Sequence, residues 1–300
     1  MTLDARSIIL KMPQAFSEVD GSSLRAQREF LMSTRIQLLL LVAAGSAGAV
    51  AWTSGSLDLA ALLGGVAFAA AALLRLILLR RRPHRRWYDG RAAAESIKTL
   101  SWRYSVGGQP FPLVVDEPRQ RFAAQVEEVL SGLRGLPPSV GDAARTPTTT
   151  MDELRDADLL ERQRAYASER IEDQRRWYAM KAESNRRRAR AWSLAIVALQ
   201  AVAAFGAFLK GFGVVDIDLF GVAAAVVASC AAWLETKQHA ALASAYQVTH
   251  DEVARIASLA AADRTESEWA GFVSESEAAF SREHTMWKAS STQRAPVGLA

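Results

Sequence analysis

Four long apolar runs, arranged in two closely spaced pairs, constrain the fold more than any other feature of the sequence. Residues 36–53 and 191–209 carry no charged side chain, and residues 59–79 carry only Arg75. The fourth run reaches full length only when it is taken as residues 217–234. Because a helix needs about 20 apolar residues to cross the hydrocarbon core of a bilayer, each run is predicted to be a membrane span.

The short connections within each pair predict two hairpins. Lipid cannot satisfy open backbone groups, so the spans must be helices. The connections around residues 54–58 and 210–218 are rich in Gly, Ser and Asp and are too short for anything but antiparallel neighbours. The predicted fold class is therefore an all-α membrane protein, with two transmembrane helical hairpins (four spans) and cytosolic helical extensions.

Positive charge marks the outer flanks of both hairpins. Cations precede the first span and follow the second in RRRPHRR. They also precede the third span in NRRRAR and follow the fourth at Lys237. The two turns, in contrast, contain a single cation, Lys210. Because Lys- and Arg-rich flanks stay in the cytosol, both termini and the long central segment are predicted to be cytosolic. The first 34 residues have no clean apolar signal-peptide region, so the first run is expected to remain as a span.

The segments outside the spans are predicted to be mostly helical. Apolar residues recur at helical spacing in 87–104 and again in 122–133. Residues 136–150 hold three prolines and several threonines and are predicted to be a linker between a first domain, 1–135, and a second, 151–285. The tail, 286–300, is expected to be disordered.

Residues 151–205 contain neither Gly nor Pro and predict one long helix that runs from the cytosol into the third span. Asp158/Arg162, Glu172/Arg176 and Glu183/Arg187 are acid-then-base pairs four residues apart, which stabilise a helix surface. Two interpretations stay open for this helix. It is either a solvated helix or a stalk that assembles with copies of itself.

A second helical pattern follows the fourth span. Its apolar positions alternate at spacings of four and three, at Leu242, Tyr246, Thr249, Val253, Ile256 and Ala260. This is a coiled-coil seam near the minimum length, which can pack within the chain or between subunits, and packing within the chain is the favoured reading. Span, turn, span and helix thus occur twice, at 36–104 and 191–260.

No sequence motif indicates catalysis. Phosphate-binding glycine loops, zinc-protease and serine-hydrolase motifs are missing, and Cys230 is the only cysteine, so no enzyme, cofactor or metal site is expected. A net charge of +4 gives no reason to expect nucleic acid as a partner. Gln200 lies near the middle of the third span, where an amide should face protein or water. It is expected either to bond between helices or to line a pore in an oligomer.

Two motifs identify a resemblance. The second half, with QRRWYAMKAESNRRRARAWSLAIVALQ and AYQVTHDEVARI, resembles the SLATT domains, which are SMODS and SLOG-associating two-transmembrane effector domains of bacteria. The first half, with RRWYDGRAAAESIKTLSWRYSVGGQPF, resembles another SLATT subfamily. The matching positions are expected to be structural or coupling positions at the membrane–cytosol junction: Arg91, Glu95, Lys98, Trp102, Trp177, Tyr178, Lys181 and Asn185.

The resemblance implies a membrane-embedded effector of a bacterial conflict or antiphage system, placed in the inner membrane. Such a chain is expected to form homo-oligomers that open a pore or perturb the bilayer on a nucleotide-linked signal. The signal would come from a nucleotide-sensing or nucleotidyltransferase partner protein. The alternative is a non-enzymatic membrane scaffold or sensor subunit that recruits cytosolic partners.

Overall fold

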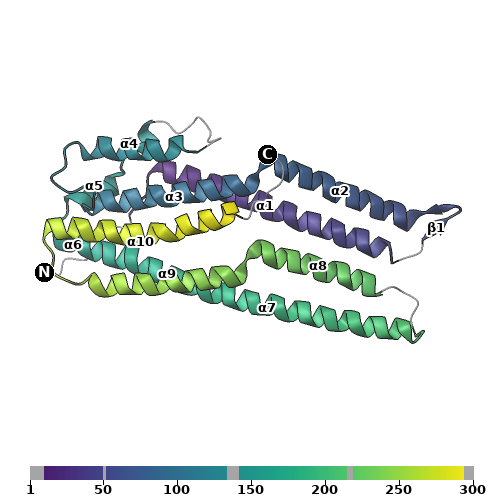
Figure 1. Ribbon diagram of the computed structural model, residues 1–300. Coiled ribbons are helices and arrows are strands. Elements are labelled where there is room, and N and C mark those ends of the chain that lie inside the picture. Colours follow the sequence, from purple (N-terminus) through teal and green to yellow (C-terminus); the bar gives the residue numbers. More distant parts are fainter. Residues whose placement is uncertain (1–9, 50–51, 134–141, 215–218, 294–300) are drawn as a thin grey trace, which may run out of the picture. The chain divides into compact units, whose positions relative to one another are not determined.

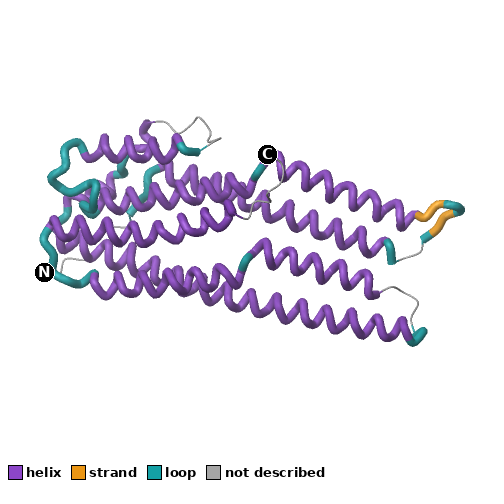
Figure 2. The backbone as a smooth tube through the Cα atoms, in the orientation of Figure 1, coloured by secondary structure: helices purple, strands orange, loops and turns teal. Residues whose placement is uncertain are grey.

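The computed structural model describes residues 10–49, 52–133, 142–214 and 219–293, which are helical almost throughout (Figure 2). The described residues divide into two compact units. Unit 1 comprises residues 1–26, 85–180 and 245–300, and unit 2 comprises 27–84 and 181–244. The elements are α1 (Gln14–Ala47), β1 (Thr53–Ser54), β2 (Leu57–Asp58), α2 (Leu59–Arg81), α3 (Pro83–Ser105), α4 (Pro118–Ser131), η1 (Asp142–Arg145), α5 (Thr149–Asp156), α6 (Leu159–Ala165), η2 (Tyr166–Ile171), α7 (Glu172–Gly211), α8 (Leu219–Lys237), α9 (His239–Leu259) and α10 (Glu266–Gln293).

Unit 2 contains the apolar parts of four helices that are long enough to cross a membrane, which confirms the predicted fold class. At most 11% of each apolar window is buried within the structure. Large apolar side chains such as Leu39, Val66 and Leu194 are more than 65% exposed. Soluble proteins rarely expose continuous apolar surface on this scale, so the outer surface of unit 2 is suited to lipid.

The turn after α1 differs from the prediction. The helix ends at Ala47, whereas the span was expected to continue to residue 53. Residues 53–58 instead form the β1–β2 hairpin, in which Gly55 has a φ of +61° and Asp58 accepts a hydrogen bond from the backbone N–H of Ala61 to cap α2. An 18-residue membrane window that ends at Ala47 therefore includes Arg35. The β1–β2 hairpin and the C-terminal end of α7 lie at the same end of unit 2 (Figure 1).

Small residues bring α1 close to both α2 and α8. A Cβ atom placed on Gly64 of α2 would lie 3.1 Å from the Cβ of Ala47 and 3.3 Å from the carbonyl oxygen of Ala44. A Cβ placed on Gly45 of α1 would lie 2.8 Å from the Cβ of Ala225 of α8. Glycine at these positions allows close helix contact, which is how membrane helices associate. The two hairpins therefore touch through α1 and α8.

Gly64 and its neighbour Gly65 offer a matched test of this packing. A Cβ on Gly65 would meet nothing within 4 Å. Gly64→Leu is expected to destabilise unit 2 by about 1–3 kcal/mol through overpacking, whereas Gly65→Leu adds the same apolar group to an open surface. Thermal unfolding in detergent, followed by circular dichroism, measures the difference. Equal losses in both variants would contradict the α1–α2 contact.

Each hairpin continues into its next helix through one residue in the left-handed region. Arg82 (φ 46°) separates α2 from α3, and Gln238 (φ 49°) separates α8 from α9. The N–H of each residue donates to a carbonyl four residues earlier, Leu78 or Leu234, at 2.9 Å. For residues other than Gly this conformation costs roughly 1–2 kcal/mol. The predicted span–turn–span–helix repeat is thus present in the structure. Both copies also have the same kink between the second span and the helix that follows it.

The core of unit 1 joins parts of the chain that are far apart in sequence. Residues of α3, α4, α10 and the segment 151–178 form one apolar cluster, which includes the buried Ile97, Phe122, Tyr166 and Trp269. The indole Nε1 of Trp269 donates to the carbonyl of Val106, just after α3, at 2.8 Å. This bond and the shared core fix α10 against the C-terminal end of α3.

The helix predicted for residues 151–205 is interrupted near its start. Ala157 has an extended conformation, and Asp158 accepts a hydrogen bond from the N–H of Glu161 at 2.8 Å and so caps α6. The predicted Asp158/Arg162 pair is therefore wrong, and Arg162 binds Glu266 instead. From Leu159 to Gly211 the helix is continuous, with η2 as a π-helical segment. Its buried face excludes the fully solvated reading.

The helix with the predicted coiled-coil pattern, α9, packs within the chain, which is the interpretation that the sequence favours. Thr249 and Val253 of α9 are buried, and Tyr246 contacts Trp177 of α7 with ring centroids 5.5 Å apart. His250 lies 3.0 Å from the carbonyl oxygen of Arg175 through its Nδ1 atom. These contacts, all within unit 1, place α9 along the N-terminal part of α7.

Candidate functional site

A fully buried ion pair lies at the π-helical segment of unit 1. Arg170 of η2 and Glu277 of α10 have side chains that are 2% and 0% exposed. The Nε and Nη2 atoms of Arg170 donate to Oε1 and Oε2 of Glu277 at 2.8 Å and 2.6 Å. Two parallel bonds of this kind are among the strongest hydrogen bonds in proteins. The pair fixes α10 to η2.

Two neutral donors complete the coordination of Glu277. The hydroxyl of Tyr166 donates to Oε1 at 3.0 Å, and the hydroxyl of Thr99 on α3 donates to Oε2 at 2.9 Å. A buried carboxylate is costly unless it is paired and hydrogen-bonded, and here four donors serve one carboxylate. Three helical segments, α3, η2 and α10, therefore meet at Glu277.

The π-helical segment η2 supplies two residues of this site, Tyr166 and Arg170. Tyr166, Arg170 and Ile171 are all buried within the six residues of η2. The ring of Tyr166 packs edge-on against Trp102 of α3 and Trp269 of α10, with centroids 5.9 Å and 5.6 Å away. Short π-helical segments inside α-helices occur frequently at functional sites. The segment η2, with its buried ion pair, is therefore a candidate functional site.

Charge extends the site along α3. Burial alone would lower the pKa of Arg170, but the charge and hydrogen bonds of Glu277 outweigh it and raise this pKa. Burial lowers the pKa of Lys98, and the nearby charge of Arg170 lowers it further, while Glu95 and Asp173 oppose this shift. Lys98, Glu95 and Asp173 therefore belong to the same electrostatic network as the buried pair.

The first predicted motif lies along one side of this network. Arg91, Glu95, Lys98 and Trp102 follow one another on α3 at spacings of four, three and four. The guanidinium of Arg91 contacts Glu95 at 2.6 Å and Asp20 of α1 at 3.3 Å, and Trp102 is only 3% exposed. The structure thus brings all four predicted residues to one face and joins them to α1 and η2.

The second predicted motif is divided between two other contacts. Trp177 and Tyr178 pack against Tyr246 in the aromatic cluster of unit 1. In unit 2, the Nδ2 of Asn185 donates to the carbonyl of Lys181 at 2.8 Å, and its Oδ1 lies 2.7 Å from Nδ1 of the buried His239. Lys181 has an exposed side chain. The second motif therefore joins α7 to α9 and does not reach Glu277.

Comparison with known protein families assigns both halves of the chain. Residues 13–163 match the family described as SMODS and SLOG-associating 2TM effector domain 3, and residues 166–287 match SMODS and SLOG-associating 2TM effector domain 1. The chain belongs to the SLATT family. It carries two SLATT domains in tandem, as the sequence motifs predicted. No curated protein and no solved structure is found to match the chain.

The two family matches show that the buried network joins the two SLATT domains. Thr99 and Lys98 belong to the first SLATT domain, whereas Tyr166, Arg170 and Glu277 belong to the second. The network therefore crosses from one SLATT domain to the other inside unit 1. The two family matches meet near residue 164, so the predicted linker, 136–150, lies inside the first match. Residues 136–141 of that linker lie outside the described residues.

Gln200, the predicted membrane site, lies on the surface of the third span. Its side chain is exposed on α7, and no hydrogen bond to it is found among the residues that the structure describes. Ala203, three residues later, is buried against the rest of unit 2 at 7% exposure. Within one chain, therefore, Gln200 faces outward, away from the neighbouring spans.

The sequence motifs do not include three residues of the buried network, which are Tyr166, Arg170 and Glu277. One signal was present. Glu277 follows Trp269 and Val273 at a spacing of four and precedes Phe280 by three, which places it in the apolar stripe of α10. An acid on an apolar stripe needs a buried cation, and this pattern indicates a network of this kind.

A cavity of about 450 Å³, lined by both polar and apolar side chains, opens beside this network. It lies between α3, α4 and α10, and its lining includes Arg103, Gln125 and Glu128. The Nη2 of Arg103 donates to the carbonyl of Ser274 at 3.1 Å, while its buried Nε has no hydrogen-bond partner among the described residues. In the described part of the chain no group of His, Cys, Asp and Glu side chains is arranged to hold a metal ion.

Proposed function

We propose that the chain is a membrane effector of a bacterial conflict system that assembles into homo-oligomers. In this proposal the oligomer opens a pore, or perturbs the bilayer, when a nucleotide-linked signal reaches unit 1 through a partner protein. SLATT domains are effector domains associated with SMODS and SLOG modules, and they are not a known enzyme family. This association supports the effector role and the kind of partner.

The outward-facing side chain of Gln200 is the observation that supports the formation of homo-oligomers. A primary amide near the middle of a span is costly when it faces lipid, and a hydrogen bond between membrane helices is worth roughly 0.6–2 kcal/mol. Because no partner is found for Gln200 in the described part of its own chain, a second copy is the natural source. The same position in a ring of copies would supply polar groups to a water-filled path.

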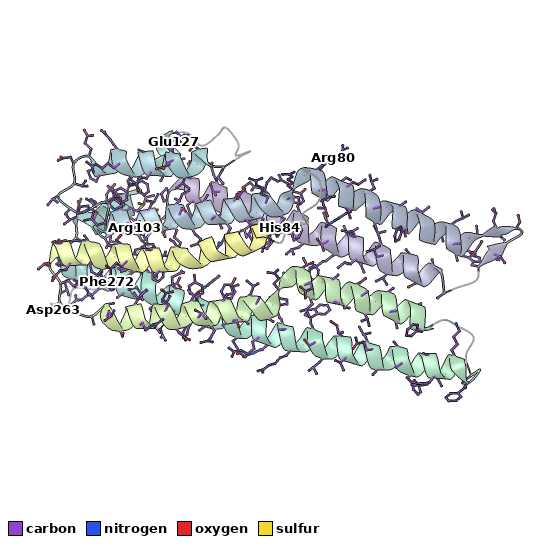
Figure 3. All side chains as sticks on the ribbon, in the orientation of Figure 1. Arg80, His84, Arg103, Glu127, Asp263 and Phe272 are labelled. Carbon is purple, nitrogen blue, oxygen red and sulfur yellow. The ribbon has the colours of Figure 1, made fainter. Side chains whose placement is uncertain are left out.

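The proposed topology places both termini and unit 1 in the cytosol of a bacterium, with the inner membrane around unit 2. The basic flanks of the spans support it, since Arg80 is labelled at the end of unit 2 opposite the β1–β2 hairpin (Figure 3). Clusters of Lys and Arg remain on the cytosolic side. A signal from a cytosolic partner would then reach unit 1, which contains the buried network.

Dye release from liposomes tests the function. The full chain is reconstituted in vesicles that contain a self-quenching dye, at increasing numbers of copies per vesicle. Leakage is expected to rise more steeply than linearly with copy number, because several copies form one path, and Gln200→Leu is expected to change it. No leakage at any density, with a chain that stays monomeric, would remove the pore and leave the scaffold reading.

Cysteine crosslinking tests the assembly at Gln200 itself. In a Cys230→Ser background, Gln200→Cys is expected to give disulfide-linked dimers in native membranes, because copies meet at this face. Ala203→Cys is the matched control, since its side chain is buried within the chain. Electrophoresis without reductant measures the dimer fraction. Equal fractions for the two positions would show that α7 does not meet a second copy at Gln200.

A further inference from the structure

Two cations contact one tryptophan in unit 2, and the charge of a third acts on one of them. The guanidinium carbon of Arg35 on α1 lies 4.9 Å from the ring centroid of Trp233, and the Nζ of Lys237 lies 5.6 Å from it. Arg188 of α7 is the third cation, because its positive charge, like that of Arg35, acts on the ammonium group of Lys237. The three residues come from α1, α7 and α8, and together with Trp233 they are named the cationic corner.

The cationic corner lies where a bilayer has its headgroups. Trp233 stands four residues before the end of α8, and Arg188 stands three residues before the third apolar run. Trp233 is only 9% exposed, so its ring is packed between helices, while Arg35 and Arg188 have exposed side chains. Tryptophan is enriched at this depth because its ring is apolar and its N–H is polar.

The three cations lack the carboxylates that their neighbours have. In unit 2, Glu183 binds Arg187 at 2.7 Å and Glu29 binds Arg81 at 3.7 Å. Among the described residues no carboxylate lies within ion-pair distance of Arg35, Arg188 or Lys237, and Glu235 of α8 points to the surface without such a bond. Like charges that meet at a half-buried site repel one another. An anion bound there would remove this repulsion.

We propose that the cationic corner binds the phosphate group of an anionic phospholipid. Basic pockets between membrane helices recognise such headgroups. Here the two guanidinium groups would donate to the phosphate oxygens, Lys237 would add charge from the side, and the acyl chains would lie along the exposed apolar surface of the spans. The source is a lipid and not a soluble phosphate, because the site is continuous with surface suited to acyl chains. This inference depends only on membrane insertion and not on pore formation.

Native mass spectrometry of the full chain, released from nanodiscs, tests the site. The nanodiscs contain equal amounts of phosphatidylglycerol and phosphatidylcholine, and the retained lipids are counted. Each cation beside an anionic headgroup is worth about a fivefold change in affinity. Arg35→Gln/Lys237→Gln is therefore expected to reduce the preference for phosphatidylglycerol by roughly 25-fold.

The control variant is Arg81→Gln/Arg187→Gln, which removes the same net charge from cations that already have carboxylate partners. It is expected to keep the preference. Glycerol 3-phosphate, added to protein in phosphatidylcholine alone, is the soluble competitor and is expected to bind weakly. The proposal is overturned if both double variants lose the preference equally, if neither loses it, or if glycerol 3-phosphate binds as well as the lipid.

Discussion

Replacing Glu277 with alanine is expected to destabilise unit 1 by about 3–5 kcal/mol, because it leaves Arg170 charged and buried without a counter-charge. The carboxylate receives four hydrogen bonds, from Arg170 (two), Tyr166 and Thr99, and all of them are lost together. In a domain of this size the loss corresponds to a fall in unfolding temperature of roughly 10 °C or more. Thermal unfolding of the purified chain in detergent, followed by near-ultraviolet circular dichroism, measures it.

Two further variants separate the network from general damage to α10. Glu275 is exposed on the same helix, and Glu275→Ala is expected to change stability by no more than about 0.5 kcal/mol. The double variant Arg170→Met/Glu277→Leu removes both charges and is expected to recover most of the stability, since a buried pair is often no better than apolar residues of similar volume. A fall for Glu277→Ala no larger than that for Glu275→Ala would mean that the pair carries little energy.

The membrane part of the fold could be predicted because the relevant signal is local. An uninterrupted apolar run specifies a lipid-facing helix by itself, so α2 and the later half of α7 lie where the sequence placed them. The predicted end of the first span was wrong, because the apolar run continues past Ala47 where α1 ends. Gly55 and Asp58 impose a tight turn on the residues that follow. Hydropathy alone does not show where along an apolar run a helix ends.

The buried network could be predicted only in part, because it depends on tertiary pairing. The motif residues Arg91, Glu95 and Lys98 of α3 were expected at a coupling position, and they border the network. Arg170 and Glu277, which form the buried pair, are 107 residues apart in sequence. The apolar stripe of α10 indicates that Glu277 needs a buried cation, but it does not indicate which one. A charged residue is almost always exposed unless it is paired with an opposite charge. A single sequence does not show which residue is the partner.

The break at Ala157 shows the same limit on a smaller scale. Asp158 and Arg162 have the spacing of a stabilising helix pair, yet the structure uses Asp158 as an N-cap. Arg162 turns inward to the carbonyls of Val106 and Ala157 and to Glu266. Asp is a strong capping residue, so a local cap competes with a local pair. The tertiary partners of Arg162 decide between the two.

The second large effect concerns α7, which carries the chain from unit 1 into the third span. Met180→Pro is expected to break this helix at the boundary between the two units. Proline removes the hydrogen bond from residue 180 to the carbonyl of Arg176, and its ring clashes with that carbonyl, at a cost of about 3 kcal/mol or more. Because the side chain of Met180 is 64% exposed, the substitution disturbs the backbone without emptying the core.

If α7 transmits movement of unit 1 to the spans, the proline variant should insert normally and yet lose its response. Met180→Ala is the control, since it removes the same side chain and keeps the helix. Carbonate extraction verifies insertion, and liposome leakage under the condition that activates the parent chain measures the response. Leakage of the inserted proline variant equal to that of the alanine variant would mean that the signal does not travel along α7. The kinked junctions at Arg82 and Gln238 would then be the places to test, because each stores left-handed strain between a span and its following helix.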